Sequence, residues 1–473
     1  MAEFVDSLHR HSIEEIFANP RAREFFIKWL AEYGDDSIAQ MGGIHLIFPS
    51  LSQIAIKHIE HQRIGIAPLE QSTRYVDFSS KINGKYRYYT DPTLESLGLK
   101  EDYETAMDNL FLTYTHLSEE LFNYLRAKYP EENLRVITAK VFDTVRGLLP
   151  TCTLSQVGFF GNGQAFEYLI ARSVDNHMGE IRWVGETAFA ELSKPIPSFL
   201  RRLVSESSLD YRKYLSERRK RVLEFMKETD VQETIISPTN IGVELIDYDP
   251  AGESKIIAVL LWKEGHESFR DIFEKVDKFS PEQKEALLQK VLADRKAIWY
   301  KIPRAFEFAD VMYEVVTNIG AWRDIQRHRL KTQERQLFIV AHGFDVPELL
   351  IEAGLDTEFS KAILAVENVY ADIAAHDLEL AQYCCTLAHR VRSLHKANLR
   401  EIWWETELRT IAQGHPDYRS IEQQLAVLVS QVYPMLAKYL MVDMNSYEFA
   451  RRGTPEKIAA KEARIRNQLS RKL

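Results

Sequence analysis

Hydrophobic positions recur at helical spacing over much of the chain. Residues 105–129 place apolar side chains on one helix face until Pro130 ends the pattern. The positions concerned are Leu110, Leu112, Tyr114, Leu117, Leu121 and Leu125. Residues 204–230 predict a second helix, in which the charged run SERRKR is typical of a solvated face rather than of a nucleic-acid contact.

A change of pattern near residue 238 indicates the start of another domain. Apolar and polar residues alternate from 243 to 248, and an Asp-Pro pair at 249–250 then interrupts them. This pattern predicts a short strand, a turn and a second apolar element at 255–262.

Several short segments recur in the same order in the two halves of the chain. His-Gln-Arg at 61–63 and Arg-His-Arg at 327–329 each end a predicted helix, the first starting near Leu51 and the second near Arg304. Further along each half, a segment beginning with asparagine is followed by an arginine. In the first half these are Asn162-Gly163-Gln164 and Arg172, and in the second half Asn398-Leu399-Arg400 and Arg409. Such a repeat indicates duplication.

The repeat predicts an organisation in tandem domains. The first domain is expected over residues 1–205 and the second over 238–454. A helical linker over 206–237 would join them, and a Lys/Arg/Glu/Ala-rich helix would follow over 455–473.

Composition narrows the class of protein. Of the 473 residues, 45% are hydrophobic, which is ordinary for a globular chain. The formal net charge of -9 is unfavourable for general binding of a nucleic-acid backbone. No run approaches the roughly 18 apolar residues of a membrane span, and the polar first residues do not resemble a signal peptide. Three cysteines, with no metal-binding spacing, suit a reducing compartment. We therefore expect a cytoplasmic protein that binds neither membrane nor nucleic acid.

The candidate chemistry is rich in arginine and poor in nucleophiles. Dinucleotide, P-loop, zinc-protease and nucleophile-elbow motifs are missing from the sequence. His58 and His61 lie three apart with no third ligand, so no metal site is expected. The segment 70–75 combines hydroxyl and guanidinium groups that can bind phosphate, and the segment 322–329 places Arg323 and Arg327 on one helix face with Arg329 near its end. Each also has a plain structural interpretation, as a polar turn and as cations at a helix end.

Taken together, these segments resemble the flavin-dependent thymidylate synthases. That family's signature is Arg-His-Arg, two variable residues, Ser, one variable, Asn-Glu, one variable, Ser, one variable, Arg-Tyr. The first half of the chain keeps its end, as Glu70, Ser72, Arg74 and Tyr75. The second half keeps its beginning, as Arg327-His328-Arg329.

Further family motifs are also divided between the halves. Arg146, Leu149 and Pro150 match Arg-x-x-Leu-Pro in the first half, whereas the equivalent arginine is replaced by Gln382 in the second. Asn-Leu-Arg survives only at residues 398–400. Gly34 to Ser37 resembles Gly-His-x-Ser with Asp35 for His, and Glu307-Phe308-Ala309 resembles Glu-His-Ala.

The resemblance implies an α+β fold and an activity. Two tandem domains are expected, each a mostly antiparallel sheet with long helices. The family uses FAD, methylenetetrahydrofolate and NADPH to convert dUMP to dTMP without an enzyme nucleophile, so the chain would be a methyltransferase of thymidylate synthesis. FAD would be the cofactor, and dUMP, the folate and NADPH the small-molecule partners.

The resemblance also implies roles for individual residues. The residues expected to bind dUMP are Glu70, Ser72, Arg74, Arg146 and Arg172, with Arg74 and Arg172 also catalytic. The residues expected to bind FAD are Ser37, Glu307, Arg327, His328, Arg329, Asn398 and Arg400. Because the two sets are complementary, a homodimer forming a pseudo-tetramer with composite sites is expected.

Two other interpretations fit the same residues. Asp35, Leu69 and the altered segment after Arg329 depart from the family motifs, which favours a flavin- or nucleotide-binding homologue that has lost or changed thymidylate synthesis. A duplicated scaffold that binds neither ligand is the third interpretation.

Overall fold

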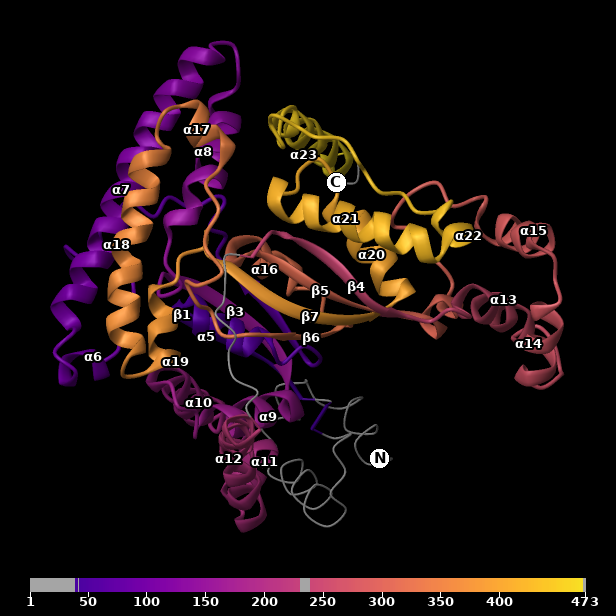
Figure 1. The fold of residues 1–473 in the computed structure, drawn as a ribbon, viewed down its shortest axis with the longest axis horizontal. Coiled ribbons are helices and arrows are strands. Elements are labelled where there is room, and N and C mark those ends of the chain that lie inside the picture. Colours follow the sequence, from indigo (N-terminus) through magenta and orange to yellow (C-terminus); the bar gives the residue numbers. More distant parts are fainter. Residues whose placement is uncertain (1–38, 41, 230–238, 471–473) are drawn as a thin grey trace. The chain divides into compact units, whose positions relative to one another are not determined.

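The chain forms two compact units (Figure 1). The computed structural model describes residues 39–40, 42–229 and 239–470. One unit comprises Met1–Gln71, Arg87–Lys100 and Cys152–Ile235, and the other Ser72–Tyr86, Glu101–Thr151 and Ile236–Leu473. The second unit therefore takes two segments from the first predicted repeat. The repeat boundaries, which concern sequence rather than compactness, stay a prediction.

The first unit is built on a three-stranded antiparallel sheet. Its order is β1-β3-β2, with β1 at Gly43–Ser52, β2 at Ile66–Glu70 and β3 at Leu154–Asn162. Burial alternates along β3, which leaves one face of the sheet for the core. The helices are α5 (Gln53–Glu60), α6 (Thr93–Ser96), α9 (Gly163–Ser173), α10 (Gly179–Leu192), α11 (Pro197–Leu200), the 3-10 turn η2 (Arg201–Val204) and α12 (Glu206–Glu228).

A buried hydrogen-bonded contact connects the sheet of the first unit to α10. Ser52 caps the N-terminus of α5, and its Oγ accepts from Ala55 N. The Ser52 N–H donates to Glu180 Oε1 over 2.8 Å, and the Ser52 hydroxyl donates to Glu180 Oε2. A carboxylate thus satisfies two buried donors at the start of a helix.

The second unit contains a four-stranded antiparallel sheet. Its order is β4-β5-β7-β6, with β4 at Gly242–Tyr248, β5 at Asp310–Asn318, β6 at Thr332–Arg335 and β7 at Arg390–Asn398. The helices around it begin with α7 (Lys100–Lys128), α8 (Leu134–Val145) and the turn η1 (Arg146–Leu148). The others are α13 (Gly252–Trp262), α14 (Phe269–Asp277), α15 (Pro281–Leu292), η3 (Arg304–Phe308), α16 (Ile319–Ile325), α17 (Glu348–Glu352), α18 (Asp356–Ala374), α19 (Leu378–Ala381), η4 (Gln382–Cys384), α20 (Leu399–Arg409), α21 (Pro416–Val432), α22 (Pro434–Ala437) and α23 (Thr454–Ser470).

The predicted helix from Arg304 to the Arg-His-Arg triplet is wrong. Only η3 and the short α16 are helical there, and β5 lies between them. Val311, Tyr313 and Val315 are buried on alternate positions, and β-branched and aromatic residues of this kind favour a strand. By contrast, the first triplet does follow a helix, α5.

Equivalent segments of the two repeats pair with each other inside the second unit. Thr151 N donates to Cys385 O over 2.7 Å, and Leu387 N donates to Leu149 O over 2.9 Å. Since the Arg-x-x-Leu-Pro segment aligns Leu149 with Cys385 and Thr151 with Leu387, the two bonds are related by an approximate two-fold axis. Gly147 leaves room for Phe359 of α18, because an added Cβ would lie 3.0 Å from its ring.

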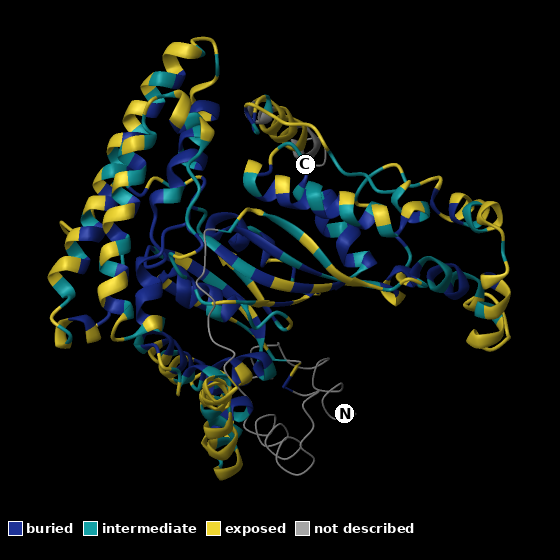
Figure 2. Cartoon of the chain, viewed as in Figure 1, coloured by how far each residue is buried: buried dark blue, intermediate teal, exposed yellow. Residues whose placement is uncertain are grey.

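Other predicted elements are present. The helix predicted at 105–129 is α7, whose buried face includes Leu110, Leu117 and Leu121. The helix predicted at 204–230 is α12, which has no buried residue and is seen exposed along its length in Figure 2. The apolar element at 255–262 is α13. The α+β fold with two antiparallel sheets and long helices is confirmed.

No helix among the described residues is both long enough and apolar enough to cross a membrane. Of the predicted linker, residues 230–237 lie outside the described residues, as do residue 238 of the predicted second domain and residues 471–473 of the predicted last helix.

Candidate functional site

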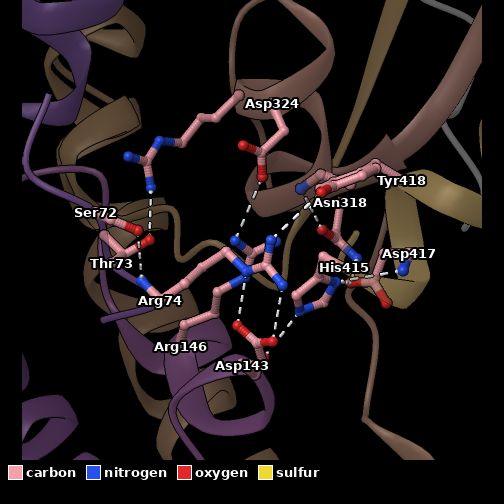
Figure 3. Close-up of polar contacts among 12 residues, drawn as sticks. Ser72, Thr73, Arg74, Asp143, Arg146, Asn318, Asp324, His415, Asp417 and Tyr418 are labelled. Carbon is pink, nitrogen blue, oxygen red and sulfur yellow. Dashed lines mark hydrogen bonds and ion pairs between the residues drawn. The ribbon is translucent and has the colours of Figure 1, made fainter. Parts of the chain in front are cut away.

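The loop after β2 carries two predicted nucleotide-binding residues into the second unit. Ser72 Oγ accepts a hydrogen bond from Arg74 N over 3.1 Å, which fixes the turn. The buried Arg74 side chain donates to Asp143 on α8, from Nε to Oδ1 over 2.7 Å and from Nη2 to Oδ2 over 2.9 Å (Figure 3). Two parallel bonds between a guanidinium and a carboxylate make a strong and geometrically specific pair.

This pair changes the pKa of both partners. Burial raises the pKa of Asp143, but the hydrogen bonds and charge of Arg74 lower it by more, to about 2. Burial lowers the pKa of Arg74, and Asp143 more than offsets that effect, so the pKa of Arg74 lies above its ordinary value. Both groups are therefore ionised at neutral pH.

A second buried ion pair joins the two repeats. Arg146, in η1, lies with its Nη1 3.6 Å from Asp324 Oδ2 on α16 (Figure 3). Burial raises the pKa of Asp324, but the charges of Arg146, Arg327 and Arg409 outweigh it and hold that pKa well below the usual range. Asp324 is thus an internal anion among guanidinium groups.

Arg146 retains an unused donor. Its side chain is 4% exposed, and its Nη2 has no hydrogen-bond partner among the described residues. Burial lowers the pKa of Arg146, against the opposing charge of Asp324. A buried guanidinium nitrogen without an acceptor is unfavourable by itself, so this position suits an added acceptor.

The second repeat supplies an aromatic side chain and a further arginine to the cluster. Tyr418 on α21 accepts a hydrogen bond at Oη from Arg74 Nη1 over 3.3 Å. The guanidinium carbon of Arg409 lies 5.5 Å from the centre of the Tyr418 ring, within cation–π range. Arg409 Nε also donates to His328 Nε2 over 2.8 Å, which leaves His328 Nδ1 as the donor toward Glu401.

A polar network continues from this cluster toward β5. Asn318 caps α16 and donates from Nδ2 to Asp345 Oδ2 over 2.9 Å and to Asp417 Oδ2 over 2.7 Å. His415 donates from Nε2 to the backbone oxygen of Asp143 over 2.9 Å. Burial, followed by the charge of Arg146, lowers the pKa of His415, so its ring is neutral at pH 7.

A cavity of about 640 Å³ lies beside these residues in the second unit. Asp143, Arg146, His415 and Arg451 are among its lining residues. Its walls are apolar as well as charged, which is typical of small-molecule sites.

The predicted flavin residues of the second repeat lie around η3, α16 and α20. Arg400 Nη1 donates to Glu307 Oε1 over 2.6 Å, and Asn398 caps α20 by accepting from Glu401 N. His328 is buried, whereas Arg327 is exposed and Arg329 partly exposed. Ser37, the remaining member of the set, lies outside the described residues.

Two predicted nucleotide residues lie in the first unit. Glu70 forms an ion pair with Lys57, whose Nζ lies 2.9 Å from Glu70 Oε2. Arg172 on α9 donates from Nη2 to the backbone oxygen of His58, and burial lowers the pKa of Arg172 to about 10. Of the predicted set, Ser72, Arg74 and Arg146 are therefore brought together in the second unit.

The acids and part of the cation set of this site were not among the predicted site residues. Asp143, Asp324 and Tyr418 carry no motif of their own. Arg409 could have been found, because it is the second-repeat counterpart of Arg172. Arg451 lies in a segment that no repeat or motif singled out.

One group of described residues has the spacing of a metal site. His328, Glu401 and Glu405 place one ligand atom each within 4.8 Å of one another. Lys331 forms a buried ion pair with Glu405, and Arg409 donates to His328. Since Lys331 neutralises Glu405 and the Arg409 N–H occupies Nε2 of His328, the cluster is better explained as a buried polar network.

Relatives of the chain cover most of its length. Proteins called UPF0159 protein from Chlamydia muridarum and Chlamydia pneumoniae are 35% and 34% identical over 447 and 444 residues, with 91% of this chain and 83% of each relative covered. A UPF0159 protein of Thermoplasma acidophilum is 28% identical over 471 residues, with 91% of both chains covered.

One solved structure has a weaker likeness. The crystal structure of a UMP/dUMP methylase, PolB from Streptomyces cacaoi, bound with 5-Br dUMP, aligns with 42% of this chain and 94% of its own, at 14% identity and a TM-score of 0.33. This likeness is too low to support a conclusion about the chain.

A family model settles the relationship. The model described as thymidylate synthase complementing protein matches residues 4–198 and again residues 244–435, so the resemblance found in the motifs is confirmed. With two tandem matches that together span more than half of its length, the chain belongs to the thymidylate synthase complementing protein family.

Proposed function

We propose that the chain is an FAD-dependent thymidylate synthase, which methylates dUMP to dTMP with methylenetetrahydrofolate and NADPH. One observation carries the proposal: Ser72, Arg74 and Arg146 of the first repeat meet Asp324, Arg409 and Tyr418 of the second repeat in one buried cluster. Family membership supports thymidylate synthesis as the reaction class.

The cluster is suited to a nucleotide monophosphate. Arg146 has a buried Nη2 that lacks an acceptor among the described residues, and Ser72 offers a hydroxyl next to Arg74. A phosphate dianion accepts several charge-assisted bonds at once, which guanidinium groups provide. Arginines next to a pyrimidine would also stabilise negative charge that develops on the ring. These residues would bind and orient dUMP without forming a covalent bond to it.

The second-repeat residues suit the diphosphate of FAD. Arg327, Arg329 and Arg400 are at least partly exposed, so their donors can reach a ligand that lies on the surface of the unit. His328 is held by Glu401 and Arg409 and would position the cofactor. When bound, FAD supplies the hydride that completes the methyl group.

An alternative is a flavin- or nucleotide-binding homologue that does not make thymidylate. The observation in its favour is that Asp143 and Asp324 already neutralise the arginines of the cluster. A dianionic ligand has to compete with these carboxylates, which weakens its binding.

A spectrum followed by an assay tests the proposal. The purified protein, supplied with FAD, should show an oxidised-flavin spectrum that shifts when dUMP is added. With methylenetetrahydrofolate and NADPH it should then release the C5 proton of dUMP and form dTMP. Flavin and dUMP binding without release of the C5 proton would favour the alternative, and binding of neither ligand would refute both.

A further inference from the structure

The residues after α22 form a segment that lies beyond the region matched by the family model, which ends at residue 435. Hydrogen bonds from α21 hold it: Arg419 Nη2 donates to Asn445 O and Gln423 Nε2 donates to Asp443 O, each over 2.8 Å. The segment is therefore an ordered part of the second unit that the family region does not include.

The same segment is fixed a second time, at the C-terminal end of α7. Phe449 packs edge to face on Tyr129 with 4.9 Å between ring centres. Arg452 Nε donates to Glu132 Oε2 over 2.7 Å. These contacts place Arg451, which lies between Phe449 and Arg452, toward the interior.

Arg451 reaches the arginine cluster. Its side chain is buried, and its Nη2 lies 3.5 Å from Asp143 Oδ1, the oxygen that also accepts from Arg74. The guanidinium carbon lies 4.2 Å from the centre of the Tyr75 ring. Asp143 and Tyr75 thus orient the guanidinium without using all of its donors.

Two donors of Arg451 have no acceptor. Its Nε and Nη1 are buried and without a hydrogen-bond partner among the described residues, as is Nη2 of Arg146. Both side chains line the 640 Å³ cavity, and Lys140 lines it too. Three buried N–H groups without acceptors are unfavourable unless a ligand accepts from them.

The unused donors, rather than the overall charge, point to an anion. Six carboxylates line the cavity together with Lys140, Arg146, Arg390 and Arg451, and most of these carboxylates have partners of their own. Asp143 pairs with Arg74, Asp345 with Arg390 and Glu352 with Lys128, while Glu448 accepts from Tyr129 and Asp417 from Asn318. A tetrahedral phosphate offers more acceptor positions than a carboxylate and so fits three or more donors better.

We propose that Arg451, delivered by the segment after α22, binds together with Arg146 the phosphate of a phosphate monoester in this cavity. The inference rests on the proposed function for the identity of that ligand, which would be dUMP. Arg451 would then be a substrate-binding residue contributed from outside the family region.

The test compares two arginine variants of the full-length protein. Arg451→Ala should weaken binding of dUMP at least tenfold in isothermal titration, while affinity for deoxyuridine, which lacks the phosphate, stays unchanged. Arg135→Ala on α8 is the control, because that side chain is exposed and does not line the cavity, and it should bind dUMP like the wild type. Wild-type affinity of Arg451→Ala for dUMP would overturn the inference. If that variant does not fold, Arg451→Gln is subjected to the same comparison.

A further titration separates this inference from the proposed function. If the wild type does not bind dUMP, the proposed function fails, and inorganic phosphate becomes the probe. Thermal stabilisation by phosphate in the wild type and in Arg135→Ala, but not in Arg451→Ala, would still support the anion site. Equal stabilisation of all three proteins, or of none, would overturn it.

Discussion

The side chain of Asp143 shows how a single acid can organise a cationic cluster. Arg74 donates two hydrogen bonds to it, Arg451 lies beside it, and its backbone oxygen accepts from His415. Removing such a carboxylate would leave a buried guanidinium without compensation, which commonly costs about 3–5 kcal/mol. Asp143 is therefore as much a part of the site as the arginines.

The lowered pKa of Asp143 predicts a dependence of stability on pH. Its pKa is about 2 in the folded protein, against an ordinary value of 3.8. The stabilisation is complete above the ordinary value and is lost as the pH falls toward 2, and it amounts to about 2 kcal/mol.

Urea unfolding at pH 7 and at pH 3 measures this effect. The free energy of unfolding of the wild type should fall between the two values, and that of Asp143→Asn should fall by less. An equal decrease in both proteins would mean that the Arg74–Asp143 pair does not contribute.

Arg74 is predicted to bind dUMP but not the flavin. Arg74→Ala should lose measurable affinity for dUMP, because it removes the guanidinium next to Ser72, and should keep bound FAD. Equilibrium binding of dUMP followed by flavin absorbance checks both, with the exposed Arg135→Ala on α8 as the control. Unchanged dUMP affinity would refute the assignment.

The complementary prediction concerns the flavin residues. Arg327→Ala combined with Arg329→Ala should release FAD, because both donors for the diphosphate are removed from the end of α16. The oxidised-flavin absorbance that remains after gel filtration measures the retained cofactor. Arg270→Ala, an exposed side chain on α14, serves as the control. A double variant that stays fully yellow would count against these residues.

Motif spacing singles out candidate arginines but not their counter-ions. Arg74 and Arg146 belong to ordered motifs, so the sequence is enough to propose them as nucleotide-binding residues. Asp143 and Asp324 act through contacts with residues distant in the chain, and a lone acid in a helix carries no signal of such contacts. The role of Arg451 likewise depends entirely on how its segment folds back.

Among the elements, helices with a regular apolar face were predicted well. The apolar face of the 29-residue helix α7 is buried from Tyr103 to Leu125, and its burial follows the predicted spacing except at Leu112, which is exposed. Strand β5 was missed because its second half is buried on both sides, so the apolar run Val315-Val316 lacks the alternation that marks a strand. Tertiary packing, not local pattern, decides the conformation of such a run.

The contact between α10 and the start of α5 gives a prediction at this scale. Glu180→Ala should lower the free energy of unfolding of the first unit by about 1–3 kcal/mol, since it leaves the buried donors of Ser52 unpaired. Hydrogen exchange of α5 amides reports the loss locally. Glu186→Ala, exposed on the same helix, should change neither quantity, and an equal effect of both substitutions would contradict the assignment.

At the scale of the whole molecule, the sequence indicates that the chain is duplicated. It does not indicate that segments of the first repeat join the compact unit of the second. The order of motifs predicts two repeats. In the structure, α7, α8 and η1 of the first repeat belong to the same compact unit as the four-stranded sheet. This arrangement depends on pairing between residues that are distant in the chain, such as Thr151 and Cys385. Periodicity and spacing carry no information about such pairing.

The assembly of the protein remains a prediction at the same scale. We propose a homodimer in which two chains form a pseudo-tetramer, because each repeat keeps only part of the motif set. Light scattering coupled to size exclusion should give about twice the chain mass of 54.9 kDa. A stable monomer that turns over dUMP would contradict this assembly.

The pairing of the Arg-x-x-Leu-Pro segment with its counterpart has a consequence for biosynthesis. The Thr151 hydroxyl donates to the backbone oxygen of Gln382, which lies 231 residues later in the chain. A nascent chain that has emerged only as far as α8 therefore lacks the partner of that segment. The apolar side chains of the segment stay unpaired until most of the polypeptide has been translated. The second unit is completed late in synthesis, and a messenger truncated between the repeats would yield an N-terminal half with Arg74 and Arg146 but without the scaffold that brings them together.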